Sequence, residues 1–184
     1  LPVDPKSKVL HGLGQNFYVY DGKLNVFPHF SNTIFSITPD STTQRYHFYF
    51  GDYHFPDDEI FQKKEYNSQA IMSEIMNNSY VRLMAPYETD EHLLVKYYVK
   101  RQVLLGIYNK KKHTAINLDP EMVIDSLHLG TFPVPIGFNH NEFIGQLTLD
   151  IQQKNRIMIP ELQKLMADYS EDSNPILIFY SLRS

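Results

Sequence analysis

The side chains best suited to chemistry gather in one acidic loop, GDYHFPDDE, at positions 51–59. Carboxylate oxygens and an imidazole can together ligate a divalent cation such as Ca²⁺, and the metal-ligand candidates are Asp52, His54, Asp57 and Asp58. Their spacing does not match the known Ca²⁺ loop pattern, in which acidic or amide residues alternate ahead of a glycine. A solvated loop that leads into a helix is the simpler interpretation. No cofactor is therefore expected, and Ca²⁺ or another divalent metal is the open alternative.

Candidate ligand contacts are scattered over separate turns. They are His29, Tyr53, His54, Asn139 and His140, whose imidazole, phenol and amide groups can hydrogen-bond or stack on a sugar or a peptide. Ordinary surface histidines and a plain turn are the competing interpretations, because Asn tolerates left-handed backbone. The sequence has no nucleophile elbow, zinc-protease, P-loop or dinucleotide motif. No catalytic residue is therefore assigned.

Composition restricts the classes of function. The 184 residues carry 17 Lys and Arg against 21 Asp and Glu, a net charge of −4, which argues against a large nucleic-acid interface. The chain has no Cys, so disulfides and thiolate nucleophiles are excluded. No apolar run approaches the ~20 residues of a membrane span. The longest basic run, at 110–112, is predicted to be a solvated hairpin tip.

The elements that position these candidates are short strands. Polar and apolar residues alternate with period two, as half-buried antiparallel strands require, and Asp21-Gly22 predicts a hairpin turn. Helices are expected over 68–77 and 160–169, the second with a proline in its first turn. Strands are expected at 16–20, 23–28, 33–38, 44–50, 80–87, 93–100, 103–108, 113–118, 134–138, 143–149 and 176–182.

The grouping of these strands predicts the fold. Sets of four, four and three strands predict an all-β chain built from about three antiparallel meanders, as in β-propeller blades, at about 15–50, 78–118 and 134–182. Propellers typically have four to eight blades, so the chain is interpreted as a single domain or the C-terminal part of a larger ring. Its missing strand would then lie upstream of Leu1, or a second copy would complete the ring. A self-contained β-sandwich is the alternative.

Two motifs resemble a known family. Residues 31–56, SNTIFSITPDSTTQRYHFYFGDYHFP, resemble the blade signature, and residues 171–184, EDSNPILIFYSLRS, resemble the closing motif, of the Bacteroides-type six-bladed β-propeller proteins with TolB-like and NHL-like relatives. The likeness covers most of the chain from Asn16 onward and departs from the family at Phe35 and Ser173. It implies the C-terminal half of a six-bladed propeller. It also implies a secreted protein, or a lipoprotein anchored upstream, about twice this length and with no established activity.

These features together predict an extracytoplasmic binding or scaffold module, located in the periplasm or on the outer cell surface. Its ligand would be a protein or a glycan at a ring face, with no catalysis, no nucleic acid and no membrane span. The alternative is a propeller enzyme, a lyase or hydrolase, with a metal held by His and Asp near the central channel. A purely structural subunit of a surface complex is a third possibility.

Overall fold

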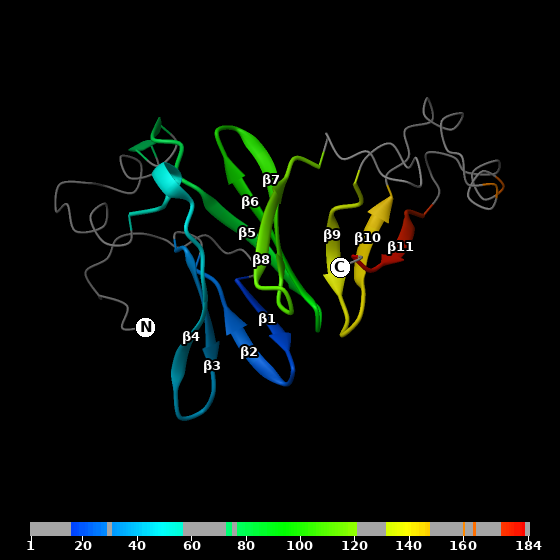
Figure 1. Cartoon of the computed structure of the whole chain (residues 1–184), viewed down its shortest axis with the longest axis horizontal. Coiled ribbons are helices and arrows are strands. Elements are labelled where there is room, and N and C mark those ends of the chain that lie inside the picture. Colours follow the sequence, from blue (N-terminus) through cyan, green and yellow to red (C-terminus); the bar gives the residue numbers. More distant parts are fainter. Residues whose placement is uncertain are drawn as a thin grey trace. The chain divides into compact units, whose positions relative to one another are not determined.

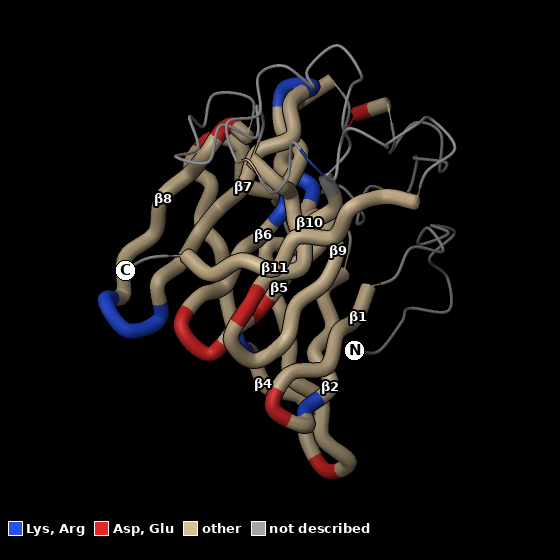
Figure 2. The backbone as a smooth tube through the Cα atoms, turned by 90° about the vertical axis from the view of Figure 1, so that its right-hand side faces the viewer, with Lys and Arg blue, Asp and Glu red and all other residues tan. Residues whose placement is uncertain are grey.

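The computed structural model describes residues 16–28, 31–56, 73–74, 77–120, 132–147, 160, 164 and 174–182. These residues form three antiparallel sheets of four, four and three strands (Figure 1). The prediction of an all-β chain made of consecutive antiparallel meanders is therefore confirmed. Within the described ranges, charged residues gather at the turns, and Figure 2 shows most of the strand backbone free of them.

The first sheet contains β1 (Phe17–Tyr20), β2 (Lys23–Val26), β3 (Thr33–Ile37) and β4 (Thr42–His47), in that order. Asp21 and Gly22 form the predicted turn, with φ of 51° and 67°, the left-handed backbone that a two-residue hairpin needs. Strand β4 starts and ends earlier than the predicted 44–50. The reason is the tight turn before it, in which the Thr38 amide donates to the Ser41 carbonyl at 2.9 Å, so that pairing begins at Thr42.

The connection from the first sheet to the second begins with η1 (Gly51–Tyr53), a 3-10 helix. The buried Asn32 anchors the chain after it: its side-chain amide donates to the Phe55 carbonyl at 2.7 Å and accepts from the Phe55 amide at 3.3 Å. Ser73, Glu74 and Asn77 are helical, within the helix predicted over 68–77. Their neighbours in that segment lie outside the described residues.

The second sheet contains β5 (Arg82–Glu88), β6 (His92–Val99), β7 (Gln102–Asn109) and β8 (Thr114–Leu118). Strand β6 alternates in sequence, yet Leu93 and Leu94, on opposite faces, are both fully buried. Strand β8 is exposed over most of its length. The alternation of β6 thus marks a strand that is covered on both faces, not the half-buried strand that the sequence predicts.

The third sheet has the order β11 (Ile176–Tyr180), β10 (Phe143–Leu147) and β9 (Pro135–Phe138). Gly145 allows a close approach, because a Cβ there would lie 2.9 Å from the Cβ of Pro133. The Tyr180 hydroxyl donates to the Pro133 carbonyl at 2.7 Å, and burial raises the pKa of this tyrosine. Pro160 and Lys164, in the second predicted helix, are also helical.

The chain divides into two compact units, residues 1–86 with 96–103 and residues 87–95 with 104–184. The second unit has a distinct core of four buried side chains, Leu94, Leu105, Ile107 and Phe143. Partly buried side chains pack around it, namely Tyr87, Leu118, Phe132, Val134, Phe138, Tyr180 and Leu182. This core joins residues of the second sheet to residues of the third within one unit. Over the described residues, no helix is long and apolar enough to span a membrane.

Candidate ligand-binding site

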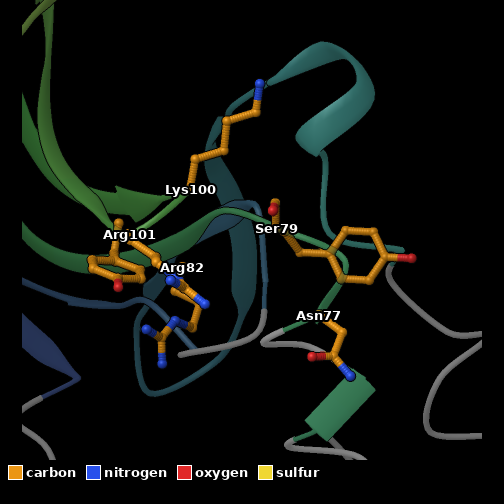
Figure 3. Close-up of a pocket in the computed structure, with 7 residues that line it drawn as sticks. Asn77, Ser79, Arg82, Lys100 and Arg101 are labelled. Carbon is orange, nitrogen blue, oxygen red and sulfur yellow. The ribbon is translucent and has the colours of Figure 1, made fainter.

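A pocket of about 240 Å³ lies in the first compact unit, beside the start of β5 and the turn between β6 and β7 (Figure 3). The pocket is lined by Asn77, Ser79, Tyr80, Arg82, Tyr98, Lys100 and Arg101. Three of these side chains are cationic and none is acidic, so the lining carries positive charge. The backbone amide of Val81 donates to the Tyr53 carbonyl at 2.8 Å, which ties the wall before β5 to the end of η1.

The turn that carries two of the cations has an unusual backbone. It consists of Lys100 and Arg101, with φ of 48° and 66°. A two-residue hairpin with positive φ at both positions ordinarily uses Asn-Gly, because a Cβ in left-handed backbone meets the following carbonyl at a cost of about 1–2 kcal/mol. Ser79 is a third such residue, with φ of 56°. Of the five non-glycine residues with positive φ in the described ranges, three therefore line this pocket.

Two of the three cationic side chains lie over aromatic rings. The Arg82 guanidinium lies 4.7 Å from the centre of the Tyr98 ring, and the Lys100 ammonium lies 4.2 Å from the centre of the Tyr53 ring. A cation over a ring face is oriented but not neutralised. In Figure 3, Arg82 and Arg101 extend to one side of the strand ends, whereas Lys100 extends the other way, toward η1. No ion pair recorded among the described residues involves any of the three.

Of the residues that the sequence predicts for this region, Tyr53 borders the pocket through its contact with Lys100. Asp52 is exposed in η1. The His54 ring lies beside His47, with 5.5 Å between ring centres. Its Nε2 accepts from the Asn32 side-chain amide at 3.0 Å, since the two Phe55 hydrogen bonds fix which Asn32 atom is the nitrogen. His54 thus supports the anchored chain after η1.

The metal hypothesis stays a prediction. Asp57 and Asp58, two of its four candidate ligands, lie outside the described residues, as does the ligand candidate His29. Within the part of the chain that is described, no group of three or more His, Asp or Glu side chains is placed to hold a metal ion.

Asn139 and His140 lie in the second unit. The Asn139 side-chain oxygen accepts from the backbone amides of Asn141 and Glu142 at 2.9 and 2.8 Å, which is the local capping that shapes a turn. The His140 imidazole lies 3.6 Å from the carboxylate of Asp90. The structure therefore gives Asn139 a turn-forming role.

A buried polar network also lies in the second unit. The Glu88 carboxylate is fully buried and 2.7 Å from the Lys110 ammonium, which also donates to the Thr89 carbonyl at 2.6 Å. The predicted solvated hairpin tip is therefore correct for Lys111 and Lys112, which are exposed, and wrong for Lys110. Lys110, the first lysine of the run, points inward because it pairs with the buried Glu88 carboxylate. No sequence pattern indicates that this carboxylate is buried.

Beside this pair, the protonation state of His92 is fixed by geometry. The Asn109 side-chain oxygen accepts from the amides of Lys111 and Lys112, so its nitrogen must donate to His92 Nε2, at 3.1 Å. Nε2 therefore carries no proton, and His92 is neutral. Burial lowers the pKa of His92, with the Glu91 charge raising it and the Lys110 charge lowering it as smaller influences.

We expect the free energy of unfolding to fall as the pH drops below about 6.5, the pKa of an unfolded histidine. Below that pH the unfolded chain binds a proton at His92 that the folded protein excludes, so acid favours unfolding. Urea titrations at pH 7.5 and 5.5 would measure the loss. His92→Gln should reduce the pH dependence. An equal slope in wild type and His92→Gln would contradict this assignment.

The pocket residues were not predicted from the sequence. A signal was present in KYYVKRQVLL, residues 96–105, where alternation on both sides of Lys100-Arg101 leaves room for only a two-residue turn. Such a turn requires positive φ, and neither residue is of the type that adopts it readily. A mismatch of this kind between turn geometry and residue type marks the turn as a candidate functional site.

Comparison with known proteins gives two matches. A model of the family described as Domain of unknown function (DUF4934) matches residues 3–181. The solved structure of a "Putative exported protein" from Bacteroides fragilis is 19% identical, with a TM-score of 0.73, and the match covers 92% of this chain and 50% of that one. The chain thus spans about half the length of that protein, and at this identity the likeness concerns the fold alone. No curated protein matches the chain.

These matches correct the family resemblance inferred from the sequence. The assignment to the C-terminal half of a TolB-like or NHL-like propeller was wrong, because the chain matches a different family over nearly its whole length. The motifs behind the resemblance, such as residues 31–56, are strands of alternating polarity joined by tight turns. Any antiparallel meander over an apolar core produces that pattern, so it does not discriminate between families.

Proposed function

The chain belongs to the family described as Domain of unknown function (DUF4934), and from its site we propose that it is a non-catalytic ligand-binding module acting outside the cytoplasm. The ligand, a protein or a glycan, binds in the pocket between the β6–β7 turn and the segment 77–80. Location outside the cytoplasm is supported by the name of the Bacteroides fragilis protein, which describes it as exported.

One observation carries this proposal: strained backbone and charge coincide in a single pocket. Ser79, Lys100 and Arg101 all hold left-handed backbone and all line the same cavity. Residues kept in costly backbone conformations persist where their side chains serve a function and concentrate at ligand sites. A pocket with a few fixed polar groups is also the usual form of a small-ligand site.

The enzymatic alternative, a lyase or hydrolase with a bound metal, has no specific observation in its favour among the described residues. The pocket offers cations, hydroxyls and an amide. These groups bind and orient a ligand, and none of the lining residues is a carboxylate or imidazole that would serve as a general base at neutral pH. A binding role therefore accounts for the lining residues without requiring a metal or a general base from outside the pocket.

We also propose that the three sheets are consecutive β-propeller blades. Each of the first two is a four-stranded meander in chain order, which is the composition of a blade. Strands β1 and β11 expose large apolar side chains, with Phe17 52% and Phe179 55% exposed, as expected if further sheets cover them in a longer protein. A crystal structure of the protein at its native length tests this. Sheets arranged around one axis would support it, and two face-packed sheets would contradict it.

Binding is tested by NMR titration of the ¹⁵N-labelled chain with neutral and acidic mono- and oligosaccharides and with short peptides. We expect at least one ligand class to shift the backbone amide signals of Ser79, Lys100 and Arg101. Signals of the Asn139–Glu142 turn serve as the internal control and should not move. Shifts confined to the second unit, or no saturable shift with any probe, would overturn the proposed function.

A further inference from the structure

We propose that the pocket recognises one acidic sugar residue, whose carboxylate or sulfate is held by Arg82 and Arg101. This inference rests on the proposed function, since it names the ligand class of the same pocket. A carboxylate and a sulfate on a sugar ring share one property: each is an anion with two or more oxygens that accept hydrogen bonds.

The two arginines supply the oxyanion contact. A guanidinium presents its N–H donors in a planar fork that matches two oxygens of a carboxylate or sulfate, which an ammonium does not. The Arg82 guanidinium carbon lies over the Tyr98 ring, 4.7 Å from its centre. Arg101 extends to the same side from the neighbouring turn (Figure 3). Two like charges that line one pocket, with no carboxylate partner recorded in the described structure, favour an anion between them.

The strained turn explains how Arg101 reaches this position. Asn-Gly would close the hairpin with less strain, but it would remove both cations from the pocket rim. Lys100 packs its ammonium over Tyr53 at 4.2 Å, on the side of the turn away from Arg82. We therefore assign Lys100 a positioning role, in which it braces the turn, and Arg101 the ligand contact.

The size and the neutral groups of the pocket favour a sugar over a peptide. Its volume of about 240 Å³ is below the ~300–1,000 Å³ of sites that enclose drug-sized ligands, so it suits a single small ring. Among the neutral lining residues, Asn77, Ser79 and Tyr80 offer an amide and two hydroxyls. These groups both donate and accept hydrogen bonds, which is the chemistry that sugar hydroxyls require.

The experiment is a calorimetric or NMR titration of the chain at low ionic strength with galacturonate, glucuronate, galactose 6-sulfate and, as the neutral reference, galactose. We expect the acidic sugars to bind at least about tenfold more tightly than galactose, because charge-assisted hydrogen bonds are roughly twice as strong as neutral ones. Added NaCl should weaken the acidic sugars and leave galactose unchanged, since salt screens exposed charges. The carboxylate and sulfate probes together identify the acid.

Variants locate the contact. Arg82→Gln and Arg101→Gln should each weaken acidic-sugar binding about tenfold, while Arg45→Gln, an arginine of the first sheet that stacks on Tyr20 and Tyr46, should not. Lys100→Gln should weaken it less than either pocket arginine. The double change Lys100→Asn with Arg101→Gly replaces the strained turn by the favoured one. It should raise the Tm and weaken acidic-sugar binding at least as much as Arg101→Gln does, so that the weaker binding cannot be attributed to misfolding.

The outcomes separate this inference from the proposed function. Equal binding of galactose and the acidic sugars at the pocket amides would overturn the acidic-sugar inference and leave the binding function standing. Tighter binding of an acidic peptide such as hexaglutamate, or of inorganic sulfate alone, would also overturn the sugar assignment. Acidic-sugar binding at full strength in the Asn-Gly variant would place the ligand elsewhere. Absence of any saturable binding would overturn both proposals.

Discussion

Replacement of Phe143 by alanine is expected to lower the free energy of unfolding by about 4 kcal/mol, the range found when a buried aromatic side chain is truncated. Phe143 is 1% exposed in the core of the second unit and packs against Leu94, Leu105 and Ile107. Its ring also lies 5.7 Å from that of Tyr180. The loss has two parts: the apolar contacts that the Phe143 ring no longer buries, and the cavity that its removal leaves in the core.

A matched control exists in the same sheet. Phe179 of β11 is 55% exposed, so Phe179→Ala should cost less than about 1 kcal/mol. Chemical unfolding monitored by tyrosine fluorescence and circular dichroism would give both values. Similar losses for the two variants would show that the core of the second unit does not depend on Phe143, and would contradict the packing described here.

Replacement of Lys110 by methionine is expected to lower the free energy of unfolding by about 3 kcal/mol. The substitution keeps the apolar stem and removes the ammonium, so the fully buried Glu88 carboxylate loses its ion pair at 2.7 Å. Because the Glu88 carboxylate is fully buried, water cannot take the place of the lost ammonium. We expect the lower end of the range for broken buried pairs, because Lys110 itself keeps 19% exposure.

Two further variants isolate the ion pair. Lys111→Met changes the next residue of the same turn, whose side chain is exposed, and should cost less than about 0.5 kcal/mol. The double change Glu88→Met with Lys110→Met removes both charges and should recover most of the stability, because hydrophobic replacement of a whole buried pair is often neutral. If the double variant were as unstable as Lys110→Met alone, the loss would come from the lysine's packing or its bond to Thr89, not from the lost ion pair with Glu88.

The strands were largely predictable, because a period of two and turn residues are local properties of the chain. Asp21-Gly22 marks the first hairpin, and eleven predicted strands correspond to the strands of the three sheets. The boundaries were less so: β4 begins at Thr42 because hydrogen bonds across the Thr38–Ser41 turn set the register. The burial of both Leu93 and Leu94 was also missed, since alternation does not report whether the second face of a strand is covered.

The candidate site was predictable only at its edge. Tyr53 was expected and borders the pocket, but Arg82 and Arg101 lie nineteen positions apart in the chain and become neighbours through the order of β5, β6 and β7. Glu88 with Lys110, and His92 with Asn109, are likewise paired only by the folded sheet. A charged residue has the same local pattern whether it is solvated or buried with a partner, so sequence alone assigns it to the surface.

The sequence by itself thus determined an all-β chain of antiparallel meanders, the positions of its strands and the turn at Asp21-Gly22. The tertiary structure alone decided which charges are buried, which protonation state His92 holds, and that a strained Lys-Arg turn meets Arg82 around one pocket. The physical reason is the separation along the chain of the residues that determine each property. Strand alternation and turn conformation depend on residues a few positions apart, whereas burial, ion pairing and pocket geometry depend on residues that only the pairing of distant strands brings together.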